Sequence, residues 1–202
     1  MSDDYPFSDL PLFGFDLIMA DPPWDFGCWS EKGEAKNAKS HYRCMSLDDI
    51  RTLPVGELAS KNCLLWLWAT NPMLDQAFEV IRAWGFQFKT AGTWVKRTRH
   101  GKLGFGTGYV LRSANEPFLL ATVSDANVPF LIATTGEIST ARNVRSVIEG
   151  PVREHSRKPD EAFAAAEQLI PRARRLELFS RQARPGWTVW GDQADKFNEV
   201  DA

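Results

Sequence analysis

The chain has 202 residues, of which 44% are hydrophobic, and its formal net charge is −2. This length suits one domain with a sizeable core, so we expect a single domain over residues 1–202, with 1–12 as a flexible N-terminal segment. The charge argues against a protein that binds long duplex nucleic acid through charge alone.

Several other classes of protein are disfavoured by composition. The three cysteines and three histidines are scattered, so we expect no metal site. Cysteines without paired spacing are typical of a reduced, cytoplasmic protein. The acidic, polar residues 1–10 do not resemble a secretion signal, and no apolar run approaches the roughly 20 residues that span a membrane.

Residues 15–20, Phe-Asp-Leu-Ile-Met-Ala, predict a buried strand that ends at Asp21. Pro22 and Pro23 follow, and because proline cannot donate to a sheet ladder, they turn the backbone out of the sheet. Asp21 is therefore expected at the carboxyl edge of a sheet, where open α/β sheets bind ligands. Trp24 would place a flat ring beside this carboxylate.

The next segments predict a loop, a strand and two helices. Polar residues 27–43 are interpreted as a mobile loop over the site, and Ser46 with Asp49 predicts a helix start. Residues 62–69 predict a second buried strand, in which tryptophans 66 and 68 pack in the core. Asn71 is expected to cap the following helix, with Pro72 at its first position and Gly85 at its end.

A third strand is predicted over residues 88–95, and a glycine-rich basic segment follows it. The basic residues of this segment are Lys96, Arg97, Arg99, His100 and Lys102. The segment is either a solvated hairpin tip or, as we favour, a flexible cationic loop that grips phosphates.

The second half of the chain predicts alternating strands and a helix. Strands are expected over residues 117–122, 128–133, 143–148, 175–179 and 187–190, and a helix from Pro159 to about residue 170. Lys158 would oppose the dipole of this helix, so it would suit a docked anion such as a cofactor carboxylate or a phosphate.

Asp-Pro-Pro-Trp at 21–24 resembles the signature of methyltransferases that use S-adenosyl-L-methionine and modify the N6 amino group of adenine. More narrowly, the chain resembles the MT-A70 family, named for the catalytic subunit of the mRNA adenosine methyltransferase. Further matches, which extend the resemblance to nearly the whole chain, are Trp-Val-Lys at 94–96, Glu116, Lys-Pro-Asp-Glu at 158–161, Glu-Leu-Phe at 177–179 and Gly-Asp-Gln at 191–193.

The resemblance assigns catalysis to the four residues of the signature. An adenine amino nitrogen is a poor nucleophile because its lone pair is delocalised into the ring. The carboxylate of Asp21 and the carbonyl of Pro22 would accept its two N–H groups and direct the lone pair at the methyl group. Pro22 and Pro23 fix the backbone, and Trp24 would stack on the base. No metal is required.

Other residues receive binding roles by the same resemblance. Cofactor contacts are expected from Asp21, Lys158, Arg181, Asp192 and Gln193, and substrate contacts from Trp24, Tyr42, Lys96, Arg97, Arg99, Glu116 and Lys158. Two features depart from the family pattern: Asp192 replaces an asparagine, and the turn after Arg181 is shorter and lacks an asparagine.

The implied fold is α/β: a seven-stranded, mostly parallel, Rossmann-like methyltransferase sheet, circularly permuted so that the catalytic motif precedes the cofactor motif. The implied function is N6-adenine methylation of DNA, since compact members are typical of bacteria and phages. Methylation of RNA, of a cytosine amino group or of a small molecule, and a catalytically weak nucleic-acid-binding partner subunit, are the alternatives. A homodimer or a partner subunit remains open, because the modest basic surface would suit a second subunit that completes the groove. The segment after residue 96 also resembles a loop that makes subunit contacts in eukaryotic members.

Overall fold

The computed structural model describes residues 5–25, 43–106, 110–123, 138–154 and 157–198. Within these residues, seven strands form one sheet in the order β5-β3-β4-β2-β1-β6-β7. Only β4 among them runs antiparallel to its neighbours, so the sheet is mostly parallel, as predicted. The strands are β1 (Phe15–Ala20), β2 (Ala59–Trp68), β3 (Phe86–Arg97), β4 (Asn115–Val123), β5 (Val147–Pro151), β6 (Arg175–Leu178) and β7 (Trp187–Trp190).

The strand order places a crevice between the carboxyl ends of β1 and β6. These two strands are parallel neighbours, but the chain leaves β1 toward β2 and leaves β6 toward β7, on opposite sides. Ligands bind at such a switch point because the two connections diverge and leave room between them. The fold therefore predicts a binding site next to Asp21.

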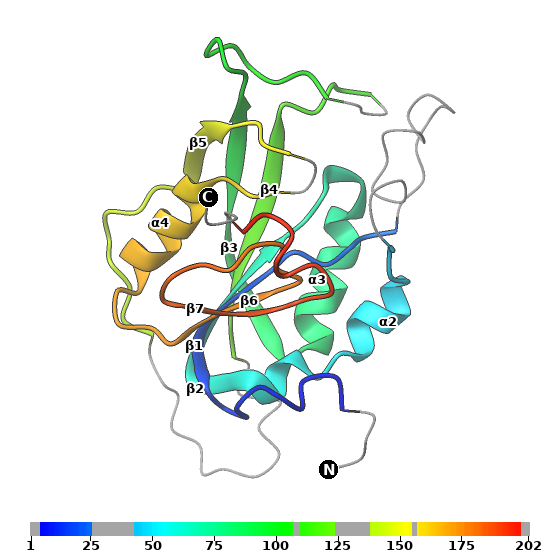
Figure 1. Cartoon of the computed structure of the whole chain (residues 1–202), viewed down its shortest axis with the longest axis vertical. Helices are drawn as coiled ribbons and strands as arrows, with labels where there is room; N and C mark the ends of the chain where they lie inside the picture. The colour runs from blue at the N-terminus through cyan, green and yellow to red at the C-terminus, as the bar shows by residue number, and fades with distance from the viewer. Residues whose placement is uncertain (1–4, 26–42, 107–109, 124–137, 155–156, 199–202) are drawn as a thin grey trace.

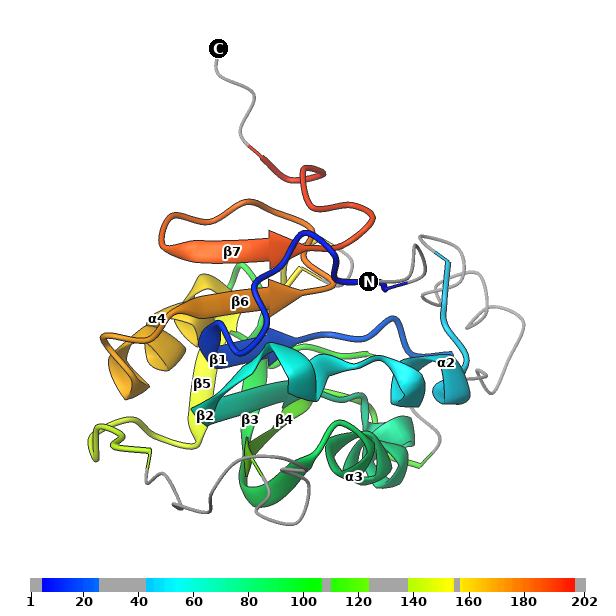
Figure 2. The ribbon, with the colours of Figure 1, turned by 90° about the horizontal axis from the view of Figure 1, so that it is seen from below.

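Helices cover both faces of the sheet. Helices α2 (Leu47–Thr52) and α3 (Leu74–Ala83), with the 3₁₀ helix η2 (Val55–Leu58), lie on one face, and α4 (Asp160–Leu169) lies on the other (Figures 1 and 2). In β1, Ile18 and Ala20 pack toward α2 and α3, whereas Leu17 and Met19 pack toward α4. Burial on both faces explains why β1 is a nearly continuous apolar run.

Several predicted elements agree with the structure, with shifted ends. Ser46 caps α2 by accepting a hydrogen bond from the backbone N–H of Asp49 at 3.1 Å. Gly85 has φ of 81° after α3, a conformation that glycine adopts without steric cost. The strand predicted over 143–148 lies at Val147–Pro151, and the one predicted over 128–133 falls outside the described residues.

One local prediction is wrong. Asn71 does not cap α3. It is the first residue of a 3₁₀ helix, η3 (Asn71–Met73), which directly precedes α3 and whose own cap position is Thr70. In the described part of the segment 1–12, which we expect to be flexible, Phe7 is fully buried and its ring centre lies 4.9 Å from that of Trp190. Phe7 thus fastens the N-terminal segment to β7.

The described helices are all too short or too polar to cross a lipid bilayer.

Candidate active site

Asp21 directly follows β1, at the crevice. Its backbone N–H donates to the carbonyl of Leu178 at 3.4 Å, which ties it to the end of β6. The carbonyls of Pro22 and Pro23 accept hydrogen bonds from Trp24 and Met45, at 2.8 and 3.0 Å. A carbonyl oxygen has two lone pairs, so the Pro22 carbonyl retains the capacity to accept a second hydrogen bond.

Lys158 holds the Asp21 side chain. Its Nζ lies 2.6 Å from Oδ2 of Asp21 and 2.7 Å from Oε1 of Glu116. The residue is 8% exposed, and its ammonium lies 5.4 Å from the centre of the buried Trp68 ring. Two carboxylates of this chain therefore already pair with Lys158, and its predicted contact with a cofactor carboxylate or a phosphate stays a prediction.

Glu116 and Lys96 extend this contact into a chain of four charges. Oε2 of Glu116, on β4, lies 2.8 Å from Nζ of Lys96, on β3. In space, the four side chains follow one another as Asp21, Lys158, Glu116 and Lys96. Their charges alternate in sign, and their sum is zero. We call these four residues the charge chain. It connects β1, β3, β4 and the segment directly before α4, in which Lys158 precedes the cap residue Pro159.

The charge chain shifts the pKa of its members. Burial raises the pKa of Asp21, with Lys158 opposing and Glu116 adding to the rise. Burial would also raise the pKa of Glu116, but Lys158 and Lys96 outweigh it and lower that pKa to about 2. Burial acts to lower the pKa of Lys158, yet Asp21 and Glu116 together raise it. Lys158 is therefore a permanent cation, and Asp21 is the more basic carboxylate.

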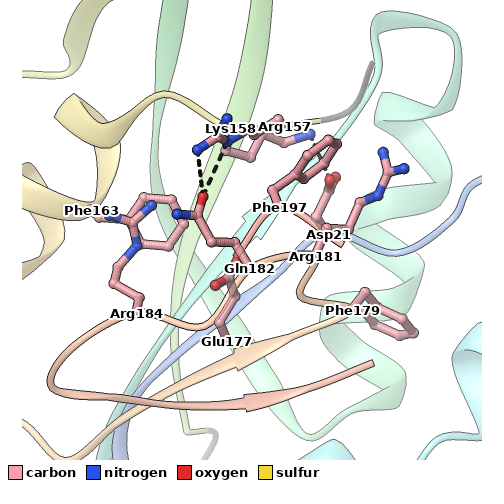
Figure 3. A pocket seen from close by; sticks show the side chains of 10 residues that line it. All are labelled: Asp21, Arg157, Lys158, Phe163, Glu177, Phe179, Arg181, Gln182, Arg184 and Phe197. Carbon is pink, nitrogen blue, oxygen red and sulfur yellow. Dashed lines mark hydrogen bonds and ion pairs between the residues drawn. The ribbon is translucent and has the colours of Figure 1, made fainter. Parts of the chain in front are cut away.

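A pocket opens beside Asp21 at the carboxyl ends of β1 and β6 (Figure 3). Its wall combines carboxylates, guanidinium groups and aromatic rings, from Asp21, Arg157, Lys158, Phe163, Glu177, Phe179, Arg181, Gln182, Arg184 and Phe197. Most of these residues were not predicted as site residues. Three of them could have been found by their closeness to a motif. Arg157 directly precedes Lys158, and the Glu-Leu-Phe match contains both Glu177 and Phe179.

Contacts among the lining side chains fix the far wall. Arg157 donates to Oε1 of Gln182 from Nε and Nη2, at 3.1 and 2.8 Å. The Phe197 ring lies 5.2 Å from the Arg157 guanidinium and 4.9 Å from that of Arg181. The Phe197 N–H also donates to the carbonyl of Arg181 at 3.0 Å. The C-terminal segment thereby closes one side of the pocket.

Phe179 adopts a left-handed backbone conformation at the end of β6, with φ of 62°. A non-glycine residue there is strained, and such strain often clusters at functional sites. The Phe179 ring packs edge-on against Trp190 at 5.7 Å, which holds the strained turn in place.

A model of the MT-A70 family matches residues 15–193. The chain belongs to the MT-A70 family. Human METTL4, an N(6)-adenine-specific methyltransferase, is 29% identical over 190 residues, which are 93% of this chain and 39% of METTL4. The Arabidopsis thaliana protein named N(6)-adenosine-methyltransferase MT-A70-like is 33% identical over 89% of this chain and 24% of its own length. The type II methyltransferase M.MunI of Mycoplasma is 28% identical over 93% of this chain and 81% of its own length.

S-adenosyl-L-methionine is the usual methyl donor of MT-A70 methyltransferases. The pocket offers groups that suit it: carboxylates for ribose hydroxyls and the ammonium, guanidinium groups for the carboxylate, and aromatic rings for the adenine. The described residues contain no group of three or more metal-ligand side chains.

Trp24, predicted to stack on the substrate base, lies in the core in the structure. Its ring is 3% exposed, and its Nε1 donates to the carbonyl of Trp68 at 3.2 Å. A ring buried in the core has no free face for a base. Trp24 instead anchors the Pro22-Pro23 turn to β2, and so positions Asp21.

The predicted cationic loop also needs correction. Lys96 and Arg97 belong to β3, and they pair with Glu116 and Glu149, at 2.8 and 2.7 Å. Arg99 lies beyond the strand, with its Nε 3.1 Å from His100. Lys96 is therefore part of the charge chain, and only the residues after Arg97 form a loop.

The remaining predicted residues fall in different places. Arg181 lines the pocket and donates from Nε to Oε1 of Gln193 at 3.0 Å, whereas Gln193 itself lies outside the lining of the pocket. Asp192 is exposed and does not line the pocket beside Asp21. Tyr42 and most of the expected loop over the site lie outside the described residues.

Glu177, which lines the pocket, is expected to make the stability of the folded protein depend on pH. Burial is the main cause that raises its pKa to about 7, from an ordinary value near 4.5. The folded protein then binds this proton more tightly than the unfolded chain does, so Glu177 lowers stability as the pH rises from about 4.5 to about 7. We expect the Glu177→Gln variant to lose this decline, whose slope is at most about 1.4 kcal/mol per pH unit. Urea unfolding at several pH values measures it, and parallel curves for both proteins would contradict the prediction.

Proposed function

We propose that this chain transfers a methyl group from S-adenosyl-L-methionine to the N6 amino group of adenine in DNA. The observation that carries the proposal is the position of Asp21, a carboxylate held by a buried lysine at the switch point of the sheet. Family membership supports the reaction, and the pocket on the β6 side of Asp21 supports binding of a donor there.

The reaction requires control of one amino group. Asp21 accepts one N–H of the amine and the Pro22 carbonyl accepts the other, so the nitrogen lone pair points at the methyl group. The bound cofactor supplies that methyl group in electrophilic form. The new N–C bond forms as the methyl–sulfur bond breaks, and the nitrogen then loses a proton. The raised pKa of Asp21 suits it to receive this proton.

Lys158 and Glu116 keep the Asp21 carboxylate in position. With two carboxylates on one ammonium, the Asp21 side chain cannot turn away without leaving a buried charge partly compensated. Lys158 therefore acts as a positioning residue. Glu177, Arg181 and Gln193 are assigned to the cofactor, with Glu177 as an acceptor for hydroxyl groups.

DNA is proposed as the polymer because this chain matches M.MunI over most of both proteins, whereas it spans less than half of METTL4. Compact members of this kind are typical of bacteria and phages. RNA is the alternative, since the relatives include proteins named as N(6)-adenosine methyltransferases.

Mass spectrometry of nucleosides tests the proposal. The protein is incubated with a donor carrying a deuterated methyl group and with genomic DNA or total RNA, and the digested nucleosides are measured. We expect labelled N6-methyldeoxyadenosine from DNA, and about 10²–10³-fold less of it in a parallel reaction of equal length with Asp21→Asn. Labelled N6-methyladenosine from RNA alone would assign the polymer to RNA, and no labelled nucleoside from either would refute the activity.

A further inference from the structure

A projecting hairpin connects β3 to β4. Its described arms are residues 98–106 and 110–114, and we call these arms the basic hairpin. Strand β3 runs parallel to β1, because β3 and β2 are both antiparallel to β4 and β2 is parallel to β1. The basic hairpin therefore leaves the sheet at the edge that carries Asp21, and it extends past the end of β5 (Figure 1).

The base of the basic hairpin is built into the active site. Lys96 precedes the first arm, Glu116 closely follows the second, and the two pair at 2.8 Å. Both belong to the charge chain, so two further ion pairs connect the hairpin to Asp21. A polymer whose base reached Asp21 would consequently pass close to this hairpin.

The arms present large apolar side chains to solvent. Leu103, Phe105, Val110 and Leu111 are 56%, 82%, 94% and 83% exposed. Backbone hydrogen bonds order the arms, from Gly104 to the Lys96 carbonyl at 2.7 Å and from Gly106 to that of Ser113 at 2.8 Å. Several exposed apolar side chains on one ordered projection indicate a contact surface.

The charge of the basic hairpin indicates which kind of partner binds to this surface. Residues 98–114 contain no acidic side chain and three cationic ones, Arg99, Lys102 and Arg112. The Arg112 guanidinium lies 5.6 Å from the centre of the Phe105 ring, so cation and ring act at one place. An isologous contact between two copies would bring two such cationic hairpins together, which like-charge repulsion opposes. A polyanion with flat apolar faces suits both features.

We infer that the basic hairpin inserts Phe105 and Leu111 into the base stack of duplex DNA beside the target adenine, while its cations contact the phosphates. The inference rests on the proposed function. An amino group inside a duplex cannot reach Asp21, so the base must leave the stack. Apolar side chains inserted between base steps open the stack in other DNA-binding proteins.

The test compares native with heat-denatured genomic DNA as substrates. In the variant Phe105→Ala/Leu111→Ala, we expect methylation of native duplex to fall about tenfold or more, and methylation of denatured DNA to change less than about twofold. The matched control, Leu12→Ala/Val147→Ala, removes apolar side chains that are 41% and 51% exposed elsewhere, and should methylate both substrates like the wild type. Equal losses on both substrates, or no loss on duplex, would overturn the inference.

A second readout does not depend on methylation. Duplex oligonucleotides with 2-aminopurine in place of scattered adenines fluoresce more when a base is unstacked. Wild-type protein should raise the fluorescence at saturation, and the Phe105→Ala/Leu111→Ala variant should not, so this signal separates failure of the inference from failure of the proposed activity. Sedimentation of both proteins without DNA completes the test. A dimer that becomes a monomer in the variant would assign the surface to self-association and overturn the inference.

Discussion

Replacement of Asp21 with asparagine is expected to lower the rate of methyl transfer about 10²–10³-fold, the effect of removing one group that stabilises charge in a transition state. The amide has nearly the shape of the carboxylate but lacks its charge and its basicity. Lys158 keeps Glu116 as a partner, so the buried ammonium is not left alone and the variant should fold. Initial rates with radiolabelled donor, together with circular dichroism, measure both expectations.

The matched control for this variant is Asp16→Asn on the same strand. Asp16 lies at the other end of β1 and binds Arg174, with Oδ1 at 2.9 Å from Nη2. Hydrogen bonds from Arg174 lower the pKa of Asp16, so this variant should lose stability but keep its catalytic rate. An Asp21→Asn protein as active as the wild type would remove Asp21 from the mechanism.

Replacement of Lys158 with methionine is expected to destabilise the fold by about 3 kcal/mol, because it leaves two partly buried carboxylates facing each other with only Lys96 to compensate them. Urea unfolding followed by tryptophan fluorescence measures the change. Replacement of an exposed lysine, Lys89→Met, should change stability by less than about 0.5 kcal/mol.

A double variant separates charge from packing at this position. In Lys158→Met/Glu116→Gln a neutral amide replaces one of the two carboxylates. This double variant should therefore be more stable than Lys158→Met alone. If the double variant is as unstable as the sum of the two single variants, the coupling through the charge chain is absent and Lys158 stabilises the fold only by packing.

The central strands could be predicted from the sequence because buried strands consist of short, nearly continuous runs of apolar residues. Phe15–Ala20 is apolar at positions on both faces, which is typical of a buried parallel strand, and Pro22 marks its end without reference to the rest of the chain. Asp21 could be placed at the sheet edge for the same reason. Residues fixed by their neighbours in sequence were thus predictable.

Residues fixed by long-range contacts were not. Lys158 and Asp21 are 137 positions apart, so local reasoning about a helix dipole could not identify the carboxylate as the partner of the lysine. Trp24 was assigned to the substrate, but its Nε1 binds the carbonyl of Trp68 across 44 positions. Whether a ring after a proline turn faces the core or the solvent depends on β2, which the signature itself does not encode.

A crystal structure with a bisubstrate analogue, adenosine joined through N6 to the donor, tests the central claim most directly. The linked N6 keeps one N–H, and we predict that it lies within about 3.2 Å of an Asp21 carboxylate oxygen or of the Pro22 carbonyl, with the donor moiety in the pocket beside β6. An analogue bound with its N6 far from Asp21, or with its donor moiety outside that pocket, would contradict the account.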